Sequence, residues 1–593
     1  MRELEYPFDS SWILKKRRSI KRMLLQSERS FLEKKIAVLG GSTTNEIVEI
    51  LDLFLLNQGI RAQFYQSEFN KFWEDVMFDN EKLIQFCPDL IYIHTSSRNI
   101  MRFPNVKNTR EQIDALLQET LGHFQAVWEK IESTFGCPVI QNNFEQAYYR
   151  LLGNQDVADI HGRLHFISRL NAEFYAYAQT HDAFYIHDIN YLASCYGLQK
   201  WADPLCWHMY KYAMDVAAIP DFSYNLSNIM KSLFGRNKKA LVLDLDDTLW
   251  GGVIGDDGPE NIEIGSETGR AEIFTEFQQY LKAHRDLGIL LATNSKNDRD
   301  TALEGLRRPD SVLREEDFTA LRINWDPKDQ NLISIARELN IGVDSLVFVD
   351  DNPAERHIVR EQLPDVGVPE LVQPEGYISV LDRAGFFEVT NLSADDLARN
   401  EMYAAESQRK RQKVSFNDYG EYLHSLEMRA EIQPFSQMYL SRIAQLTNKS
   451  NQFNLTTLRC TKGDIQRFAD DDRYITRYGK LEDKFGDNGV VSVVSGHIEA
   501  KCLHLDLWLM SCRVLKRDME YAMMDAVVQA CKERGLTGIY GYYYPTAKNE
   551  MVKEFYAQMG FEQLSEDEDG NSKWFFSVPE RYENKNKVIK VGV

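Results

Sequence analysis

Three aspartates, Asp244, Asp246 and Asp247, follow directly after the apolar run "ALVL" in a chain of 593 residues. In an extended strand the side chains alternate between faces, so Asp244 and Asp246 are expected to point toward one site at the strand end. Buried carboxylates repel one another and lose hydration, which is costly unless a positive group neutralises them. The spacing therefore predicts a cation site, or chemistry on a negatively charged group, at the carboxyl end of this strand.

The stretch "LVLDLDDTLW" fits the pattern hhhDxDx[T/V] and resembles the first motif of the haloacid dehalogenase-like (HAD) phosphotransferases. This resemblance implies that Asp244 attacks phosphorus to form an aspartyl-phosphate. It implies that Asp246 protonates the leaving oxygen and then activates water. It also implies a Mg²⁺ ion held by Asp244, by the backbone carbonyl of Asp246 and by a later acidic residue. Thr248 completes the motif as a phosphate-binding hydroxyl.

Three further stretches follow in the order that the resemblance implies. "LLATNSKND" ends an apolar strand in hydroxyl groups, of which we expect Ser295, with Thr293 as the alternative, to bind a phosphoryl oxygen. "INWDPKDQN" supplies Lys328, a cation for the phosphoryl group and for the nucleophile. "LVFVDDNPAE" ends another apolar strand in Asp350 and Asp351, which are placed to complete the metal shell.

Some residues of these motifs, taken one at a time, also have a purely structural interpretation. Asn297, a further candidate for phosphate binding, and Asp351 are each as compatible with a turn or a helix cap, whereas the ordered set favours an active site. Between Thr248 and Ser295 there is room only for a flap and a helix, and between Ser295 and Lys328 only for a helix and a loop. We therefore expect no cap domain, and a site open to a phosphate carried on something large.

Composition excludes several classes of function. The net charge of −20, from 69 basic and 89 acidic residues, argues against a nucleic-acid partner. No apolar run approaches the ~20 residues of a membrane span, so no membrane insertion is expected. The amino terminus lacks the residue order of a signal peptide. Eight cysteines without CxxC or paired zinc spacing fit reduced thiols, so a cytoplasmic protein is predicted.

Strand and helix patterns predict a multidomain α/β chain in four parts. Residues 1–232 read as a three-layer α/β domain with a parallel sheet, and "FGRNKKA" marks its end. Residues 233–390 carry the motifs above and predict a capless, HAD-like Rossmannoid domain. Residues 391–430 predict a charged helical connector. Residues 431–593, with shorter strands and closing helices, predict an α+β domain.

Long motifs from about residue 238 to 590 resemble the FkbH-like family. They are "LDLDDTLWGGVIGDDG", "NSKND", "INWDPKDQNL", "VFVDDNPAER", "LTNKSNQFNLTT", "KFGDNGVVSV" and "LMSCRVLKRDME", and "VLGGSTTNEI" is similar to the N-terminal domain of longer members. The resemblance implies a HAD-like half joined to an acetyltransferase-like (GNAT) half. It also implies that a glyceryl unit from 1,3-bisphosphoglycerate, a small phosphorylated acyl donor, is loaded onto an acyl carrier protein and that the phosphate is removed.

The last part resembles a GNAT domain with one departure. "YYYPTAKNEMVKEFYAQMGF" is similar to the final GNAT segment, in which Asn549 and Tyr556 would flank the acyl-thioester arm. The GNAT pyrophosphate loop, R/Q-x-x-G-x-G/A, lets backbone N–H groups approach phosphate, but here "RVLKRD" contains neither glycine. Free coenzyme A is therefore a doubtful donor. We expect Arg513, Lys516 and Arg517 to serve a carrier protein's phosphopantetheine arm instead.

Two stretches supply candidate groups for acyl transfer. Cys512 ends the apolar strand "DLWLMSC", and a thiol near Arg513 and a helix N-terminus would have a lowered pKa, which suits attack on an acyl phosphate. The alternative is a buried core cysteine. "NKSNQFN" offers the amides of Asn451, Gln452 and Asn454 for a glyceryl hydroxyl or the carbonyl oxygen, although such amides also cap helices.

The first part resembles an SGNH-type fold, because Gly40-Gly41-Ser42 stands where those hydrolases carry G-D-S. No DxxH occurs in that part of the chain, so the usual Asp/His pair is missing in its spacing. Asp203 with His208, or His187 with Asp188, are the substitutes that the sequence offers. We favour docking or substrate binding over hydrolysis, and Ser42 as a helix N-cap is the structural alternative.

Three functions fit these patterns. The first is the glyceryl transferase and phosphatase that the family resemblance implies. The second is a HAD-type phosphatase or acyltransferase that acts on a sugar or nucleotide-linked precursor in surface polysaccharide biosynthesis. The third is a scaffold whose flanking domains only bind partners.

Overall fold

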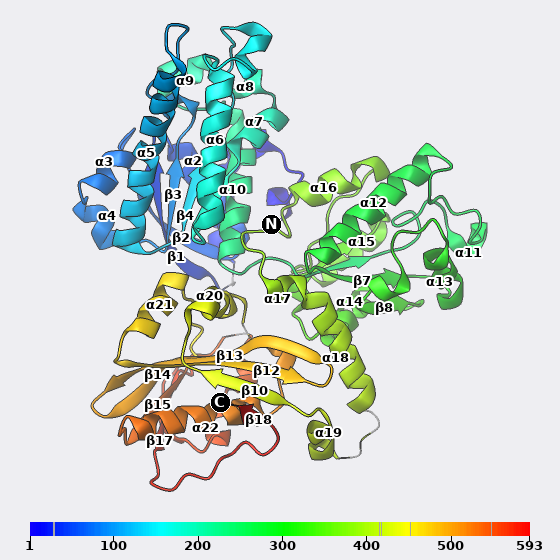
Figure 1. Ribbon diagram of the computed structural model, residues 1–593. Helices are drawn as coiled ribbons and strands as arrows, with labels where there is room; N and C mark the ends of the chain where they lie inside the picture. The colour runs from blue at the N-terminus through cyan, green and yellow to red at the C-terminus, as the bar shows by residue number, and fades with distance from the viewer. Residues whose placement is uncertain (28–29, 414–415, 417, 451, 547, 593) are drawn as a thin grey trace. The chain divides into compact units, whose positions relative to one another are not determined.

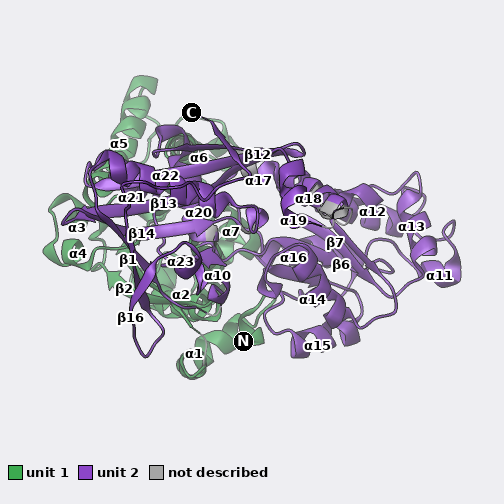
Figure 2. Cartoon of the chain, turned by 90° about the horizontal axis from the view of Figure 1, so that it is seen from below, with its two compact units in different colours: residues 1–234 green, residues 235–593 purple. Residues whose placement is uncertain are grey.

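The structure, a computed structural model, consists of two compact units, Met1–Phe234 and Gly235–Val593 (Figure 2). It confirms the multidomain α/β class, because the described residues form two parallel sheets and one mixed sheet. No helix within the described ranges is long and apolar enough to cross a membrane. The structure describes residues 1–27, 30–413, 416, 418–450, 452–546 and 548–592.

A parallel five-stranded sheet in the order β2-β1-β3-β4-β5 forms the centre of the first unit (Figure 1). Helices cover both faces, as in other doubly wound sheets of this strand order. The strands are β1 (Leu32–Gly40), β2 (Ile60–Gln66), β3 (Leu90–His94), β4 (Val139–Asn142) and β5 (Phe184–His187). The helices are α1 (Ser10–Leu25), α2 (Asn45–Asn57), α3 (Phe72–Met77), α4 (Glu81–Phe86), α5 (Arg110–Phe135), α6 (Arg163–Thr180), α7 (Ile189–Tyr196), α8 (Leu198–Trp201), α9 (Pro204–Tyr210) and α10 (Ile219–Leu233).

The run "IAVL" in β1 shows why this strand is apolar on both faces. Ile36 and Val38 join the core under α1, α2 and α10. Ala37 and Leu39 point the other way and join the core under α5 and α6. All four side chains are fully buried. A strand with a helical layer on each face needs apolar residues at consecutive positions, which the sequence supplies.

The second unit begins with a parallel four-stranded sheet in the order β8-β7-β6-β9. Its carboxyl ends all lie at one edge, because the strands are parallel, and that edge carries the acidic motifs. The strands are β6 (Ala240–Leu243), β7 (Leu290–Ser295), β8 (Ala320–Ile323) and β9 (Leu346–Val349). The helices are α11 (Ile254–Asp257), α12 (Gly269–Asp286), α13 (Arg299–Arg307), α14 (Lys328–Glu338), α15 (Pro353–Gln362) and α16 (Tyr377–Arg383).

A small flap occupies the place between β6 and α12. It is held by isolated bridges from Asp246 to Trp250 and from Gly251 to Glu263, and it contains the short helix α11. Gly252 turns the flap with a φ of +94°, where a Cβ atom would lie 2.6 Å from a carboxylate oxygen of Asp257. No separate cap domain is present in this described segment, as the spacing predicted.

A buried ion network fastens the connecting helix α18 (Arg399–Lys413) to the strand β12 (Tyr474–Asp483). Arg409 donates two hydrogen bonds of 2.8 Å to the carboxylate of Asp483, and Arg517 donates a third of 3.1 Å. Arg517 also pairs with Glu406. The side chains of Arg409 and Asp483 are 2% and 0% exposed. The network thus holds Arg517, which the sequence had suggested for phosphate binding, inside the fold.

We expect Asp483→Asn to destabilise this region by about 3–5 kcal/mol, because the change leaves two buried arginines without their carboxylate. Hydrogen exchange of peptides from β12 and α18 measures the local free energy of opening. The matched control is Glu482→Gln on the same strand, where the side chain is exposed. Equal protection of these peptides in both variants would show that the network contributes nothing to stability.

A nine-stranded sheet forms the last part of the second unit. Its main order is β16-β17-β15-β14-β13-β12-β10-β18, and β11 pairs with β14. The strands other than β12 are β10 (Arg429–Gln433), β11 (Phe453–Asn454), β13 (Gly486–Glu499), β14 (Cys502–Met510), β15 (Gly538–Tyr543), β16 (Glu562–Glu566), β17 (Ser572–Ser577) and β18 (Lys590–Gly592). The helices other than α18 are α17 (Ala394–Leu397), α19 (Tyr419–Ser425), α20 (Leu440–Lys449), α21 (Lys462–Asp470), α22 (Met519–Glu533) and α23 (Phe555–Gln558).

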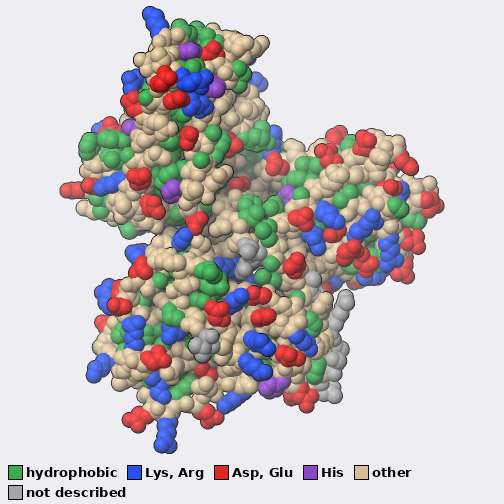
Figure 3. Space-filling model, in the orientation of Figure 1, with side chains coloured by type: hydrophobic (Ala, Val, Ile, Leu, Met, Phe, Trp, Pro, Cys, Tyr) green, Lys and Arg blue, Asp and Glu red, His purple; other side chains and the backbone are tan. Residues whose placement is uncertain are grey.

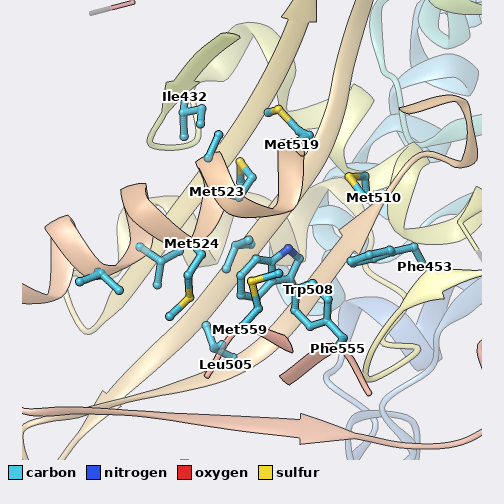
Figure 4. Packing of buried hydrophobic residues seen from close by; sticks show 14 of the residues in the cluster. Ile432, Phe453, Leu505, Trp508, Met510, Met519, Met523, Met524, Phe555 and Met559 are labelled. Atoms are coloured by element: carbon cyan, nitrogen blue, oxygen red, sulfur yellow. The ribbon is translucent and has the colours of Figure 1, made fainter. Parts of the chain in front are cut away.

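The strands β14 and β15 run parallel but separate after a short paired stretch. Their register covers only the first three residues of β14, from Cys502 to His504. Beyond that point the segment 453–455 lies between them: Leu455 N–H donates to Trp508 O, and Tyr544 N–H donates to Leu455 O. Figure 4 shows Phe453 beside Trp508 and Phe555 in the core that this segment helps to fill. The opening between the two strands is therefore closed by the chain itself.

Candidate active site

Loops at the carboxyl edge of the four-stranded sheet bring the HAD-type motifs together. Asp244 follows β6, Ser295 ends β7, Lys328 begins α14 and Asp350 follows β9. The backbone N–H of Asp244 donates to Val349 O at 2.9 Å, which fixes the ends of β6 and β9 side by side. Residues that are separated by more than a hundred positions thus meet at one edge.

Lys328 is the cation between two of the aspartates. Its Nζ atom lies 3.1 Å from Oδ1 of Asp244 and 2.5 Å from Oδ2 of Asp350. All three side chains are buried. Burial alone lowers the pKa of Lys328, but the charges of Asp244 and Asp350 outweigh it and raise that pKa. Lys328 is therefore charged, and it holds the proposed nucleophile in place.

Three carboxylates form a site that fits a divalent cation. Asp244, Asp350 and Asp351 offer oxygen atoms that all lie within 4.8 Å of one another. Burial, and then the charge of Asp244, raises the pKa of Asp350 to about 7 and that of Asp351 to about 6. One lysine does not neutralise this cluster, and carboxylate oxygens are the ligands that Mg²⁺ prefers. The donor set therefore fits Mg²⁺.

The flap holds Asp246 in position. One carboxylate oxygen accepts hydrogen bonds from Trp250 Nε1 at 2.9 Å and from the Ile254 backbone N–H at 3.1 Å. The other accepts one from Asn297 Nδ2 at 2.8 Å. Burial raises the pKa of Asp246 in spite of these bonds, which favours the protonated form that an acid needs. Asn297, a candidate for phosphate binding, thus orients Asp246 in this structure.

The hydroxyl candidates differ in their surroundings. Thr248 is buried, and its Oγ1 accepts a hydrogen bond of 3.2 Å from the backbone N–H of Asp351. Thr293 lies inside β7 with a fully buried hydroxyl that has no hydrogen-bond partner among the described atoms. Ser295 lies two residues further along and ends β7, at the carboxyl edge of the sheet where the acidic residues follow β6 and β9. This position favours Ser295 over Thr293 for the phosphoryl oxygen.

Arg356 is a positioning residue that sequence reasoning missed. Its Nη1 donates to the backbone carbonyls of Asp350 at 2.8 Å and Asp351 at 2.6 Å, and its Nη2 reaches Glu370 and Leu371 O. The side chain is buried at the start of α15. The sequence signal for this role was the position of the arginine, in the first helical turn after "DDNP". An arginine so close to the acidic strand end can turn back and bind the backbone of that loop.

We expect Arg356→Met to weaken Mg²⁺ binding by about 10–100-fold, the usual cost of losing a group that supports metal ligands. The reason is that the loop carrying Asp350 and Asp351 loses both of its guanidinium bonds. The measurement is the Mg²⁺ concentration dependence of phosphate release, with direct calorimetric titration of Mg²⁺. Arg360→Met is the matched control one helical turn later, where the guanidinium binds Glu370 and Val368 O. Unchanged Mg²⁺ affinity in the Arg356 variant would contradict the assignment.

The candidates in the first unit do not form a Ser-His-Asp arrangement. Ser42 is buried, and its hydroxyl has no hydrogen-bond partner among the described atoms. Asp203 caps α9 by accepting from Leu205 N and Cys206 N, while His208 is exposed. A Cβ atom on Gly41 would lie 2.4 Å from Asn99 Nδ2, so close packing explains the glycine. A role in docking or substrate binding stays a prediction.

The other proposed pair, His187 and Asp188, takes separate hydrogen-bond partners. His187 is fully buried and bonds through Nδ1 to Asn142 Oδ1 at 3.0 Å. Burial lowers its pKa to about 3, so it is neutral. Asp188 caps α7 and accepts a hydrogen bond of 2.6 Å from Asn143 Nδ2.

In the last part of the chain, several candidates support the fold. Asn549 is fully buried and donates to Asn454 O and Tyr544 O. The side chain of Asn454 accepts from Thr457 N and donates to Ser450 O. Tyr556 is buried, with its ring beside those of Phe555, Phe561 and Trp574. Asn549 thus helps to hold the segment 453–455 between β14 and β15, and a role beside an acyl-thioester arm stays a prediction.

The remaining acyl-transfer candidates have different surroundings. Lys516 is exposed, and its backbone carbonyl accepts from the Tyr419 hydroxyl. Gln452 and Arg513 line one cavity. Asn451 and the side chain of Cys512 lie outside the described part of the structure, and the cysteines that it describes are free thiols. Among those of these side chains that the structure describes, Gln452 and Arg513 are brought together at one cavity.

A parallel sheet with acidic strand ends, a buried lysine and a flap instead of a cap defines a HAD-like phosphatase fold. The model of the FkbH N-terminal domain matches residues 35–231. A crystal structure of the N-terminal part of BF1531 from Bacteroides fragilis, which contains a phosphatase domain complexed with Mg, is 30% identical with a TM-score of 0.59. It covers 63% of this chain and 99% of that chain. The chain belongs to the FkbH family.

Acetyltransferase structures also match, over about a quarter of this chain. The ribosomal-protein-S18-alanine N-acetyltransferase from Escherichia coli is 11% identical, covers 27% of this chain and 99% of its own, and gives a TM-score of 0.21. Ard1 from Thermoplasma volcanium is 18% identical, covers 26% and 99%, and gives 0.20. The comparison with curated proteins gives no match.

Proposed function

We propose that this protein is a Mg²⁺-dependent phosphatase joined to a glyceryl transferase. It would load a glyceryl unit from 1,3-bisphosphoglycerate onto the thiol of an acyl carrier protein and remove the phosphate, in the cytoplasm. The observation that carries the phosphatase part is Lys328 between Asp244 and Asp350, with Asp351 beside them. A protein that only binds partners through its flanking domains would not need this buried cluster of charges, which lowers the stability of the fold.

The phosphatase reaction follows from the positions of these side chains. Asp244 attacks phosphorus while Lys328 keeps its carboxylate oriented and offsets charge on the phosphoryl oxygens. Asp246, held by the flap, donates a proton to the leaving oxygen and later takes one from the attacking water. Bound Mg²⁺ supplies charge neutralisation at Asp244, Asp350 and Asp351. The absence of a cap in the described segment leaves room for a phosphate on a large carrier.

Support for acyl transfer comes from the sequence motifs around Cys512. A thiolate there would attack the acyl carbon of the donor, the bond from that carbon to the phosphate oxygen would break, and inorganic phosphate would leave. The carrier's thiol would then attack the enzyme thioester, take the acyl group and release the cysteine thiol. The loop "RVLKRD", which lacks both glycines of the GNAT pyrophosphate loop, supports a donor other than free coenzyme A.

Intact-mass analysis tests the proposal directly. Candidate acyl carrier proteins are incubated with the enzyme, Mg²⁺ and 1,3-bisphosphoglycerate. We expect one carrier to gain the mass of a glyceryl group. Phosphate release without any loaded carrier would favour the alternative substrate, a sugar or nucleotide-linked glycan precursor.

A further inference from the structure

A cavity of about 360 Å³ lies in the second unit, away from the phosphatase site. Lys239, Leu290 and Ser345, which line it, precede or begin β6, β7 and β9. They belong to the amino edge of the four-stranded sheet, whereas the acidic cluster lies at the carboxyl edge. Asp244 is five residues beyond Lys239, or about 16 Å along an extended strand. The cavity is therefore a second site.

The charge of this cavity is opposite to that of the chain. Its lining carries six basic side chains and only one acidic side chain, Asp344, although the chain as a whole has a net charge of −20. On the face shown in Figure 3, acidic and basic side chains are instead intermingled. The basic side chains come from segments far apart in sequence and are Arg236, Lys239, Arg399, Arg442, Arg513 and Lys548.

Two of these arginines form no salt bridge with a described carboxylate. Burial lowers the pKa of Arg236, and the charge of Asp344 offsets this only in part. Lys548 pairs with Asp344 and Arg399 with Asp396. Arg236 and Arg513 form no ion pair with any described residue; the side-chain contacts of Arg513 are with Ser511 Oγ and Met402 Sδ. Like charges at close range repel one another, so a bound anion stabilises such a lining.

Arg459, next to this lining, is also affected by the positive charge of the cavity. It donates a hydrogen bond of 2.9 Å to the carbonyl of Ser450, which lines the cavity. Burial, and then the charge of Arg236, lowers the pKa of Arg459 to about 10.

The rest of the lining suits a ligand with a short organic part. The Oε1 atom of Gln452 is buried and has no hydrogen-bond partner among the described atoms, so it can accept from a hydroxyl or an amide. Leu290, Phe453 and Met510 supply apolar walls. Ser511 and Arg513 flank Cys512 in sequence. An anion bound here would lie near the residue proposed for acyl transfer.

We propose that this cavity binds the phosphate group of a phosphorylated organic ligand, held by Arg236 and Arg513 with Gln452 reading its polar part. This inference rests on the proposed function, which supplies the reason why the enzyme would bind a phosphorylated ligand at a second site. Two sources share this chemistry: the small acyl donor, and the phosphopantetheine arm of the carrier. Because the two sites lie at opposite edges of one sheet, a phosphoryl group handled here must travel before Asp244 can remove it.

Calorimetric titration of the full chain tests the site. The probes are 3-phosphoglycerate, 4′-phosphopantetheine and inorganic phosphate, added in EDTA so that the phosphatase cluster stays negative and does not attract anions. We expect at least one organic probe to bind, and Arg236→Gln and Arg513→Gln each to weaken it by about tenfold or more. The probe that binds more tightly identifies the source. Affinity should also fall as the salt concentration rises.

Arg473→Gln is the matched control, since Arg473 is 80% exposed and pairs only with Asp471 among the described residues. It should bind like the wild type. Phosphate release from a small phosphomonoester with Mg²⁺ should be unchanged in Arg236→Gln, which separates this site from the phosphatase. If the organic probes bind to the cavity but no carrier protein is loaded, the proposed function is wrong and the phosphate site still stands. Absence of binding to all three probes, or wild-type binding by both arginine variants, would overturn the site.

Discussion

Asp244→Asn is expected to lower the rate of phosphate release by a factor on the order of 10³ or more, because covalent catalysis supplies rate factors of that size. The amide keeps the size of the side chain and its hydrogen bond to Lys328, so the fold should persist. The carboxylate that attacks phosphorus is lost, and one metal ligand is lost with it. The measurement is phosphate release from a small phosphomonoester at saturating Mg²⁺.

Asp256→Asn provides the matched control for this variant. Asp256 belongs to the short flap helix α11, and its side chain is exposed. It should release phosphate at the wild-type rate. That result would show that loss of an acidic residue near the site does not by itself slow the reaction. Normal turnover by the Asp244 variant would mean that another carboxylate is the nucleophile, and the HAD-type mechanism for this chain would be wrong.

Cys512→Ser is expected to abolish loading of the carrier protein, or to trap the acyl group on the enzyme. Exchange between two thioesters is nearly balanced in energy, whereas an oxygen ester on serine is more stable and passes its acyl group on poorly. Mass spectrometry should find a thioester-sized adduct on the wild-type enzyme and no labile adduct on the variant. Phosphate release from a small phosphomonoester should stay near the wild-type rate, because Asp244 follows β6 of the four-stranded sheet and Cys512 follows β14 of the nine-stranded sheet. Changes at separate sites without shared partners act independently.

Cys502→Ser controls for the loss of a thiol from the strand β14, which ends two residues before Cys512. We expect it to load the carrier normally. If the serine variant of Cys512 loads the carrier at the wild-type rate, Cys512 is a core residue, and transfer runs directly to the carrier or through another cysteine. Loss of loading in the Cys502 variant would identify that other cysteine.

The sequence alone determined the class of chemistry. Each HAD-type motif is a short apolar strand followed at once by polar residues, and both properties are local, so they can be read without a structure. The resemblance to the HAD motifs implied that Asp244, Ser295 and Asp350 serve one site, and parallel strands, which place their carboxyl ends at one edge, explain how they meet. The short spacing between motifs predicted the absence of a cap. These expectations depended on short motifs and on their order and spacing along the chain. They did not depend on how distant segments pack together.

Only the tertiary structure decided which partner each polar group takes. Asn297 binds Asp246, and Arg517 enters a buried network with Asp483, although both had been candidates for phosphate binding. An amide or a guanidinium can serve a ligand or a neighbouring side chain equally well. The choice depends on what lies within 3 Å after folding, and the sequence order does not contain that information.

The same reason explains the two features that the sequence did not reveal. The segment 453–455 lies between β14 and β15, and the basic cavity joins Arg236, Arg442 and Arg513 from three separate stretches of the sequence. Each of these residues is unremarkable in its own stretch of sequence. Local patterns determine strands and the residues at their ends, whereas a cavity and its charge exist only where separate segments pack against one another.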